Sequence, residues 1–130
     1  MLASARLKTI LCTTRLNEAR QFYGQVLGLA LAGTSDGALV FSVGGADLLV
    51  APVASAEPSP HTVVGFAVPD LEAVMASLRA RAVVFARFEG LAHDAHGIVR
   101  SPDGARVVWL RDPDGNILSI VEYPPALSNN

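Results

Sequence analysis

The stretch that decides the fold is LKTILCTTRLNEARQFYGQVLGL, residues 7–29. It opens with a short run suited to a strand and continues with apolar residues at helical spacing. The same pattern returns in TVVGFAVPDLEAVMASLRARAVV, residues 62–84. The apolar rows are Leu16, Ala19, Phe22, Tyr23, Val26 and Leu27 in the first stretch, and Leu71, Val74, Met75, Leu78 and Ala82 in the second. The repeat predicts two similar modules, neither of which covers its apolar face alone.

Polar residues and glycine mark the ends of the expected helices. Asn17 and Asp70 stand where an N-cap side chain should accept hydrogen bonds from free backbone N–H groups. Gly28 is suited to end the first helix, because glycine readily adopts the left-handed conformation. We expect the second helix at 71–81.

Strand-like runs and turn residues divide the rest of the chain. Gly44-Gly45 and two Pro-Asp-Gly turns, at 102–104 and 113–115, predict tight connections between strands. We expect loops at 33–37 and 90–97 and a frayed tail at 124–130. The expected strands are 29–32, 38–43 and 46–51 in the first half, and 63–68, 83–88, 105–111 and 117–123 in the second. Each half therefore reads β-α-β-β-β.

The length and composition are those of one globular domain. The chain has 130 residues, of which 51% are hydrophobic and 17% are charged, so disorder is disfavoured. The Pro- and Ser-rich PVASAEPSP, residues 52–60, indicates a linker. We predict a single domain over 1–130, with module 1 at about 5–52, a linker at 53–60 and module 2 at about 61–124. The fold class is α+β: two βαβββ modules form a curved mixed sheet with helices outside, and its other face lines a cavity.

Charge and cysteine content exclude several function classes. A net charge of −2 with scattered basic residues disfavours nucleic-acid binding. The single Cys12 forms no internal disulfide, and the absence of a leader pattern favours the cytoplasm. No apolar run approaches the roughly twenty residues that a membrane helix needs. The high apolar fraction favours a homodimer.

Two motifs resemble those of a known family. RLNEARQFYGQVLGL, residues 15–29, resembles the DL-x-x-A-x-x-FY-x-x-x-LG signature of the vicinal oxygen chelate superfamily, and RDPDGNILSIVEYP, residues 111–124, resembles its DPDGN closing strand. Glyoxalase I, extradiol dioxygenases, fosfomycin-resistance enzymes and bleomycin-binding proteins belong to this superfamily. The resemblance implies the glyoxalase/bleomycin-resistance fold. Arg15 departs from the usual Asp of the signature.

In the enzymes of this superfamily, the resemblance implies a divalent metal held by His, Gln or Glu on the inner face of the sheet. The matching positions here are Lys8, Leu49, Val63 and Ser119. The ammonium group repels cations, the two hydrocarbon side chains have no lone pair, and a neutral hydroxyl is a weak ligand. We therefore predict no metal and no other cofactor.

The remaining chemical groups leave alternatives open. His61 shares strand parity with Val63 and could become a ligand after a register slip, or it is an ordinary strand-edge histidine. His93 and His96 are spaced to suit a metal only in a helix, and solvated loop histidines are the expected case. Lys8 could bind an anion or form an imine, or its ammonium reaches solvent. Cys12 shares parity with Lys8 and is more typical of core filling than of a nucleophile.

The candidate ligand-binding residues follow from strand alternation. If Ser119 faces the cavity, then Ile117, Val121 and Tyr123 face it too, while Leu118 and Ile120 pack under the helices. Phe41 and Trp109 are aromatic and could stack on a ligand or fill space, and alternation does not assign them a face. The full candidate set is Lys8, Cys12, Phe41, Leu49, Val63, Trp109, Ser119 and Tyr123. No catalytic residue is assigned.

These observations predict a metal-free protein that binds a small apolar or aromatic molecule in the sheet cavity or a dimer cleft. It resembles the bleomycin-type sequestration proteins more than the enzymes. One alternative is a metal-dependent lyase or dioxygenase that recruits His61. The other is a non-catalytic interaction domain whose cavity has closed.

Overall fold

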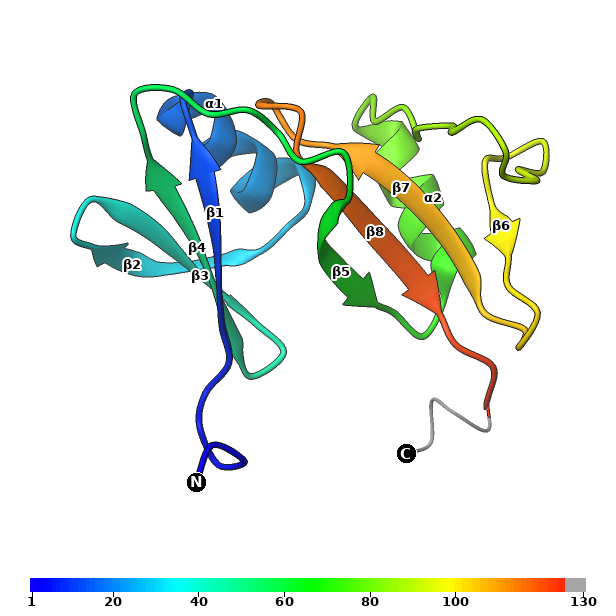
Figure 1. The fold of residues 1–130 in the computed structure, drawn as a ribbon, viewed down its shortest axis with the longest axis horizontal. Helices are drawn as coiled ribbons and strands as arrows, with labels where there is room; N and C mark the ends of the chain where they lie inside the picture. Colours follow the sequence, from blue (N-terminus) through cyan, green and yellow to red (C-terminus); the bar gives the residue numbers. More distant parts are fainter. Residues whose placement is uncertain (126–130) are drawn as a thin grey trace. The chain divides into compact units, whose positions relative to one another are not determined.

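The computed structural model describes residues 1–125, and the chain divides into two compact units (Figure 1). The first unit is Met1–Pro58 and the second begins at Ser59, so the boundary falls inside the predicted linker. Each unit corresponds to one expected module. That the two modules form a single domain stays a prediction, and the predicted frayed tail lies mostly outside the described residues. Within residues 1–125, no helix is long and apolar enough to cross a membrane.

The first unit is a four-stranded mixed sheet with a helical segment against one face. Its strands lie in the order β1-β4-β3-β2, and β1 runs parallel to β4 whereas the other pairs are antiparallel. A π-helical turn, η1, continues directly from α1. The elements are β1 (Lys8–Thr13), α1 (Leu16–Gln21), η1 (Phe22–Val26), β2 (Ala30–Ser35), β3 (Ala38–Val43) and β4 (Ala46–Pro52).

Strand alternation sends one row of side chains from each strand into the core of the first unit. The helical segment contributes Ala19 and Tyr23, both fully buried. Each large apolar side chain removed from water stabilises the fold by about 1.5–3 kcal/mol. The buried strand residues are Leu11, Thr13, Ala38, Leu39, Phe41, Leu48 and Val50.

The ends of the first helix differ in part from expectation. The prediction that Asn17 is the N-cap is wrong, because α1 already begins at Leu16. The cap residue is Arg15, whose side chain makes no cap hydrogen bond. Instead, Oγ1 of Thr13 accepts a 3.0 Å hydrogen bond from the Arg15 N–H. Gly28, at φ +74°, does follow the end of the helical segment as predicted.

The loop predicted at 33–37 is wrong in part. Strand β2 runs on to Ser35, and the reversal takes only Asp36 and Gly37, both with positive φ. A register shift between Leu31 and Gly33 keeps β2 paired with β3, which turn-type composition alone does not reveal. The Gly44-Gly45 turn between β3 and β4 is confirmed, with φ values of 52° and 86°.

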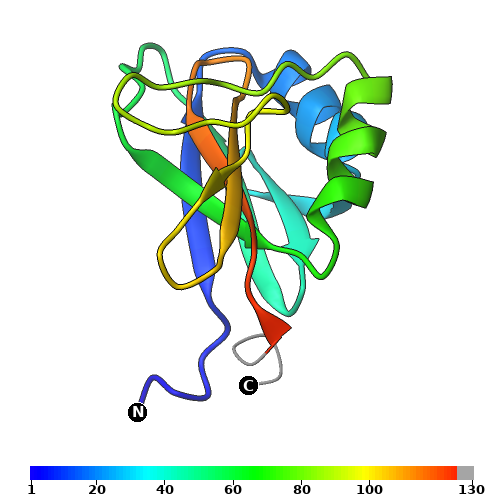
Figure 2. The ribbon, with the colours of Figure 1, turned by 90° about the vertical axis from the view of Figure 1, so that its right-hand side faces the viewer.

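The second unit repeats this architecture with a shorter edge. Its strand order is β5-β8-β7-β6, again with one parallel pair, β5 and β8. In Figure 2 the helix α2, drawn in green, lies to one side of β7 and β8. The elements are β5 (Thr62–Ala67), α2 (Leu71–Ala80), β6 (Val99–Arg100), β7 (Arg106–Arg111) and β8 (Ile117–Glu122).

The helix α2 begins as predicted and supplies the core of its unit. The carboxylate of Asp70 accepts a 3.1 Å hydrogen bond from the Ala73 N–H, which confirms this cap. Leu71, Met75 and Leu78 are buried along one helix face. The buried strand residues of the same unit are Val108, Leu110, Ile117, Leu118 and Ile120.

The strand predicted at 83–88 is wrong. Only Ala86 forms a bridge, to Trp109, and the short β6 takes the edge position beside β7. Ala82, at φ +65°, turns the chain sharply after α2, and the Phe88 N–H donates to a histidine ring instead of a neighbouring strand. A β-branched and aromatic run therefore did not become a strand, because its backbone groups found local partners.

Candidate functional site

In the first unit, three of the four candidate residues, Lys8, Cys12 and Leu49, lie on the sheet face away from the helix. Lys8, Ile10 and Cys12 are exposed and alternate with the buried Leu11 and Thr13. Ile10 is 64% exposed, which is high for a large apolar residue. The structure therefore places Lys8 and Cys12 on one face, as alternation predicted. Leu49 shares that face, because it is the cross-strand partner of Ile10.

Charged groups cluster at one end of this face. Nε of Arg6 donates a 2.8 Å hydrogen bond to Asp47, the cross-strand partner of Lys8. That hydrogen bond, assisted by the charges of Arg6 and Lys8, lowers the pKa of the Asp47 carboxyl. Two cations thus surround one carboxylate, which leaves this end of the face with a positive excess.

In the second unit, the equivalent face is built around Ser119. Ser119 pairs with Gly65 on β5 and with Trp109 on β7, so the three residues form one row across the sheet. A Cβ at Gly65 would lie 2.9 Å from Ser119 Oγ, so only glycine fits without displacing the hydroxyl. Ser119 and Trp109 are half-buried, whereas Leu118 and Ile120 are buried on the helix side as predicted.

Trp109 belongs to an aromatic cluster with Phe88 and His93. Its ring meets Phe88 edge to face, with centroids 5.6 Å apart and planes at 88°. The His93 ring lies 5.9 Å from Trp109 at 74°. Such arrangements are favourable beyond the area that they bury. The guanidinium of Arg111 lies over the Phe88 ring, 5.3 Å from its centroid, so a cation also contacts this cluster.

His93 is held more tightly than the expected solvated loop histidine. Its Nε2 accepts a 3.0 Å hydrogen bond from the Phe88 N–H, so the ring proton resides on Nδ1, which donates to the Gly97 carbonyl at 2.9 Å. Both ring nitrogens are therefore occupied within this segment, and His93 serves to order it. His96 is exposed, as predicted.

The register relates the four positions that the family resemblance assigns to metal ligands. Leu49 pairs with Ile10 in the first unit as Ser119 pairs with Gly65 in the second. Lys8 lies two residues before Ile10, and Val63 lies two residues before Gly65. A cationic amine, two hydrocarbon side chains and a hydroxyl do not make a donor set for a divalent ion, so the residues present do not fit the metal of the family's enzymes. Within residues 1–125 no group of three or more His, Cys, Asp and Glu could hold a metal.

The other candidates lie apart from these rows. Phe41 is fully buried on the helix side of its sheet, 6.0 Å from the Tyr23 ring, so it belongs to the core and not to the face of Lys8. Val63 is 36% exposed at a register shift in β5, and Tyr123, 40% exposed, follows the end of β8. His61 is exposed before β5, and its N–H donates to Ser59 Oγ.

Two βαβββ modules, each with a four-stranded mixed sheet, define a protein of the glyoxalase-like class. The model of the Glyoxalase/Bleomycin resistance protein/Dioxygenase superfamily matches residues 6–120. The chain belongs to this superfamily, and the resemblance in its two motifs is confirmed.

Solved structures agree on the fold. A lactoylglutathione lyase from Agrobacterium tumefaciens is similar with a TM-score of 0.70 and 22% identity, over 92% of this chain and 93% of that one. A putative glyoxalase family protein from Bacillus anthracis reaches a TM-score of 0.75 with 16% identity, over 93% and 96%. At these identities the similarity shows the fold alone. A search of curated proteins finds no match.

Proposed function

We propose that this protein is a metal-free member of its superfamily that binds a small, apolar or aromatic molecule and sequesters it without chemical change. The observation that carries the proposal is the row Gly65, Ser119 and Trp109 in the second unit. It combines a half-buried indole, a hydroxyl that can orient a ligand, and a glycine whose missing side chain makes room for that hydroxyl. This is the combination of apolar surface and few polar groups that small-molecule sites share.

The donor chemistry supports binding over metal-assisted catalysis. Lys8, Leu49, Val63 and Ser119 occupy the positions where the family's enzymes carry metal ligands, and they supply no carboxylate or imidazole. The apolar character of the open faces also supports an apolar ligand, since Ile10 alone is 64% exposed. Burial of such surface under a ligand contributes about 25 cal/mol per Å².

Tryptophan fluorescence tests the proposal directly. Trp109 is the single tryptophan of the chain, so its emission reports on this face alone. Planar aromatic compounds should change the emission in a saturable way and raise the melting temperature. Trp109→Ala should abolish most of the thermal shift, whereas Leu31→Ala, at an exposed leucine of β2, should preserve it. Stabilisation that survives Trp109→Ala unchanged would contradict the proposed site.

The two other functions are less well supported. A metal-dependent lyase or dioxygenase needs His61, which lies exposed before β5. An interaction domain with a closed cavity would bury Trp109 completely, whereas this residue is only half-buried. We also propose, from the high apolar content, that the protein is a homodimer in the cytoplasm; light scattering at several protein concentrations tests the dimer.

A further inference from the structure

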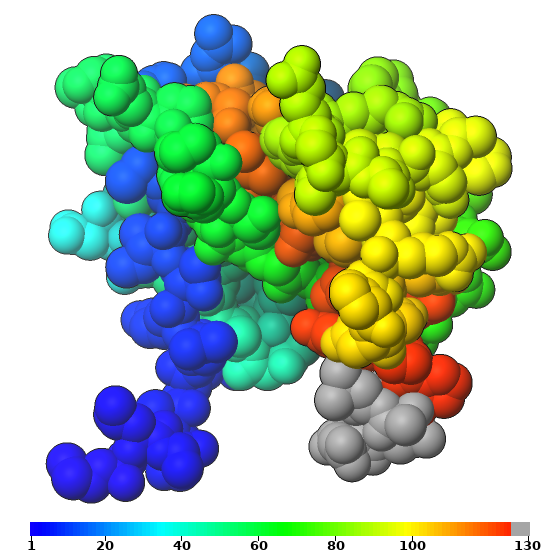
Figure 3. Space-filling model, turned by 45° about the vertical axis from the view of Figure 1, so that its right-hand side comes forward, coloured from blue at the N-terminus to red at the C-terminus, as the bar shows by residue number. Residues whose placement is uncertain are grey.

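A pocket lies in the second unit, and none of the residues that line it belongs to the row Gly65, Ser119 and Trp109. It has a volume of about 520 Å³ and lies between the C-terminal end of α2 and the segment 82–97 that follows it. Figure 3 shows this segment, coloured yellow-green, on the surface of the unit. Its walls are apolar around a basic rim: Val83, Val84 and Phe85 line it together with Arg79, Arg87 and His96.

The two arginines of the rim are held in place by the same short stretch of backbone. Nη2 of Arg79 donates a 3.0 Å hydrogen bond to the His96 carbonyl, and its guanidinium lies 5.3 Å from the Phe85 ring centroid. Nη2 of Arg87 donates to the carbonyls of Asp94 and Ala95, at 2.9 and 3.2 Å. Both cations are thus positioned before any ligand arrives, which lowers the entropy lost on binding.

Each of the two guanidinium groups has N–H donors left for a ligand. A guanidinium has five N–H groups, and within residues 1–125 Nε and Nη1 of both Arg79 and Arg87 make no hydrogen bond. Paired N–H groups of this kind match the oxygens of phosphate and carboxylate. Among the described residues that line the pocket, none is acidic.

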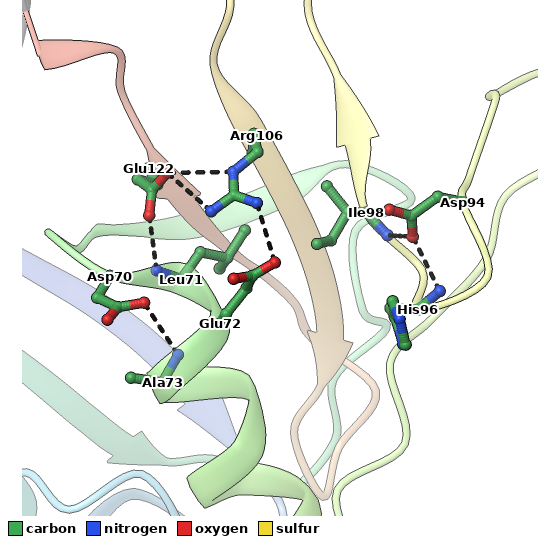
Figure 4. Close-up of polar contacts among 9 residues, drawn as sticks. All are labelled: Asp70, Leu71, Glu72, Ala73, Asp94, His96, Ile98, Arg106 and Glu122. Carbon is green, nitrogen blue, oxygen red and sulfur yellow. Dashed lines mark hydrogen bonds and ion pairs between the residues drawn. The ribbon is translucent and has the colours of Figure 1, made fainter.

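The Asp94 carboxylate, in the loop that holds the arginines, is already engaged. Oδ1 of Asp94 accepts hydrogen bonds from the N–H groups of His96 and Ile98, at 2.8 and 2.9 Å (Figure 4). The carboxylate therefore orders the loop that supplies the carbonyls for the arginines, and it does not line the pocket.

We propose that this pocket binds a small organic anion, with its phosphate or carboxylate group between Arg79 and Arg87 and its apolar part against Phe85 and Val83. The volume is within the range of about 300–1,000 Å³ typical of small-molecule sites. None of the residues that line the pocket belongs to the row of Trp109, so binding at the two sites can be tested with separate substitutions.

Isothermal titration with phenyl phosphate, benzoate, phenol and inorganic phosphate tests this assignment. One equivalent of phenyl phosphate or benzoate should bind, and the tighter of the two identifies the preferred anionic group. Arg79→Gln and Arg87→Gln should each weaken binding by about tenfold or more, because a hydrogen bond to a charged group is lost. Arg81→Gln is the matched control: it removes the same charge from the same helix end, but Arg81 donates to Ser77 and does not line the pocket.

The outcomes separate the site from a general charge effect. Equal weakening by Arg81→Gln and Arg79→Gln would overturn the proposal, as would the absence of saturable binding by the wild type. If phenol bound as tightly as phenyl phosphate, the arginines would not contribute to the affinity and the proposal would fail. Binding of inorganic phosphate as tight as that of phenyl phosphate would remove the role of Phe85 and Val83. If Arg79→Gln unfolds the protein, Arg79→Lys, which keeps the charge but loses the fork, should still weaken binding relative to Arg81→Lys.

Discussion

Gly65 and Ser119 are cross-strand partners in β5 and β8, and a methyl group at position 65 would lie 2.9 Å from Ser119 Oγ. That distance is too short for a carbon and an oxygen, so the hydroxyl depends on glycine opposite it. Ser119 is also the cross-strand partner of Trp109 on β7. The polar group of the proposed ligand face is therefore fixed by a neighbour without a side chain.

Gly65→Ala tests this relationship. The new methyl group should overpack the row and lower the free energy of unfolding by about 1 kcal/mol, at the low end for such changes because a serine hydroxyl can rotate away. Ser119→Ala on the Gly65→Ala background should recover most of that loss, as measured by urea unfolding followed through Trp109 emission. Additive effects of the two substitutions would show that the residues do not touch.

The stability of the second unit should fall in acid because of Glu122. Its pKa is lowered, chiefly by the hydrogen bond from the Leu71 N–H at 2.9 Å and also by Arg106, whose Nη2 lies 2.9 Å away (Figure 4). A carboxyl whose pKa is lower in the folded state than its ordinary value of 4.5 stabilises the fold above that pH, and the contribution disappears as the pH falls.

Glu122→Gln measures this contribution by removing the charge of Glu122, while Glu72 still pairs with Arg106. The substitution should lower the unfolding free energy by about 1 kcal/mol at pH 7, because the ion pair with Arg106 is lost while an amide oxygen still accepts from Leu71. At pH 3 the variant and the wild type should have nearly equal stability. A difference that does not change between pH 7 and pH 3 would contradict this role.

Replacing Ala82 with glycine should make the folded protein more stable. Its φ of +65° is a left-handed conformation, which costs an alanine roughly 1–2 kcal/mol, whereas a glycine gives back about 0.4–1 kcal/mol in the unfolded chain. Ala82→Gly should therefore stabilise the protein by about 0.5–1 kcal/mol in a thermal melt. Ala76→Gly, on the exposed face of α2, should instead destabilise the protein by about 1 kcal/mol.

Leu118 should be among the most sensitive positions of the core. It is fully buried on the helix side of β8, so Leu118→Ala should leave a cavity and cost about 2–5 kcal/mol. Val121 is half-buried, and Val121→Ala should cost clearly less. Chemical denaturation of both variants gives the comparison, and equal losses would show that the two faces of β8 are packed alike.

Repeated patterns in the sequence predicted the architecture because they encode local geometry. The two apolar rows, the cap at Asp70 and the turn at Gly44-Gly45 depend on spacing and on backbone freedom, and both can be read from residue types. The DPDGN turn is of the same kind: the buried Asp112 accepts backbone hydrogen bonds from Asp114 and Asn116, as expected of an Asp in a turn.

The segment after α2 could not be predicted in this way. Its β-type residues suggest a strand, yet the left-handed Ala82 and the bond between His93 and Phe88 give the backbone other partners. The basic pocket was missed for a similar reason. Arg79 and Arg87 are eight positions apart and look like scattered surface charges, and only the carbonyls of 94–96 bring them to one rim.

Lys8, Leu49, Val63 and Ser119 should hold no divalent ion at the positions that the family resemblance assigns to metal ligands. Titration calorimetry of the chelator-treated protein with Ni²⁺, Zn²⁺, Mn²⁺, Co²⁺ and Fe²⁺, the last without oxygen, measures this. We expect no stoichiometric binding in the wild type, and no difference between the wild type and Ser119→Ala. One ion bound tightly per chain, and lost in His61→Ala or Ser119→Ala, would contradict it.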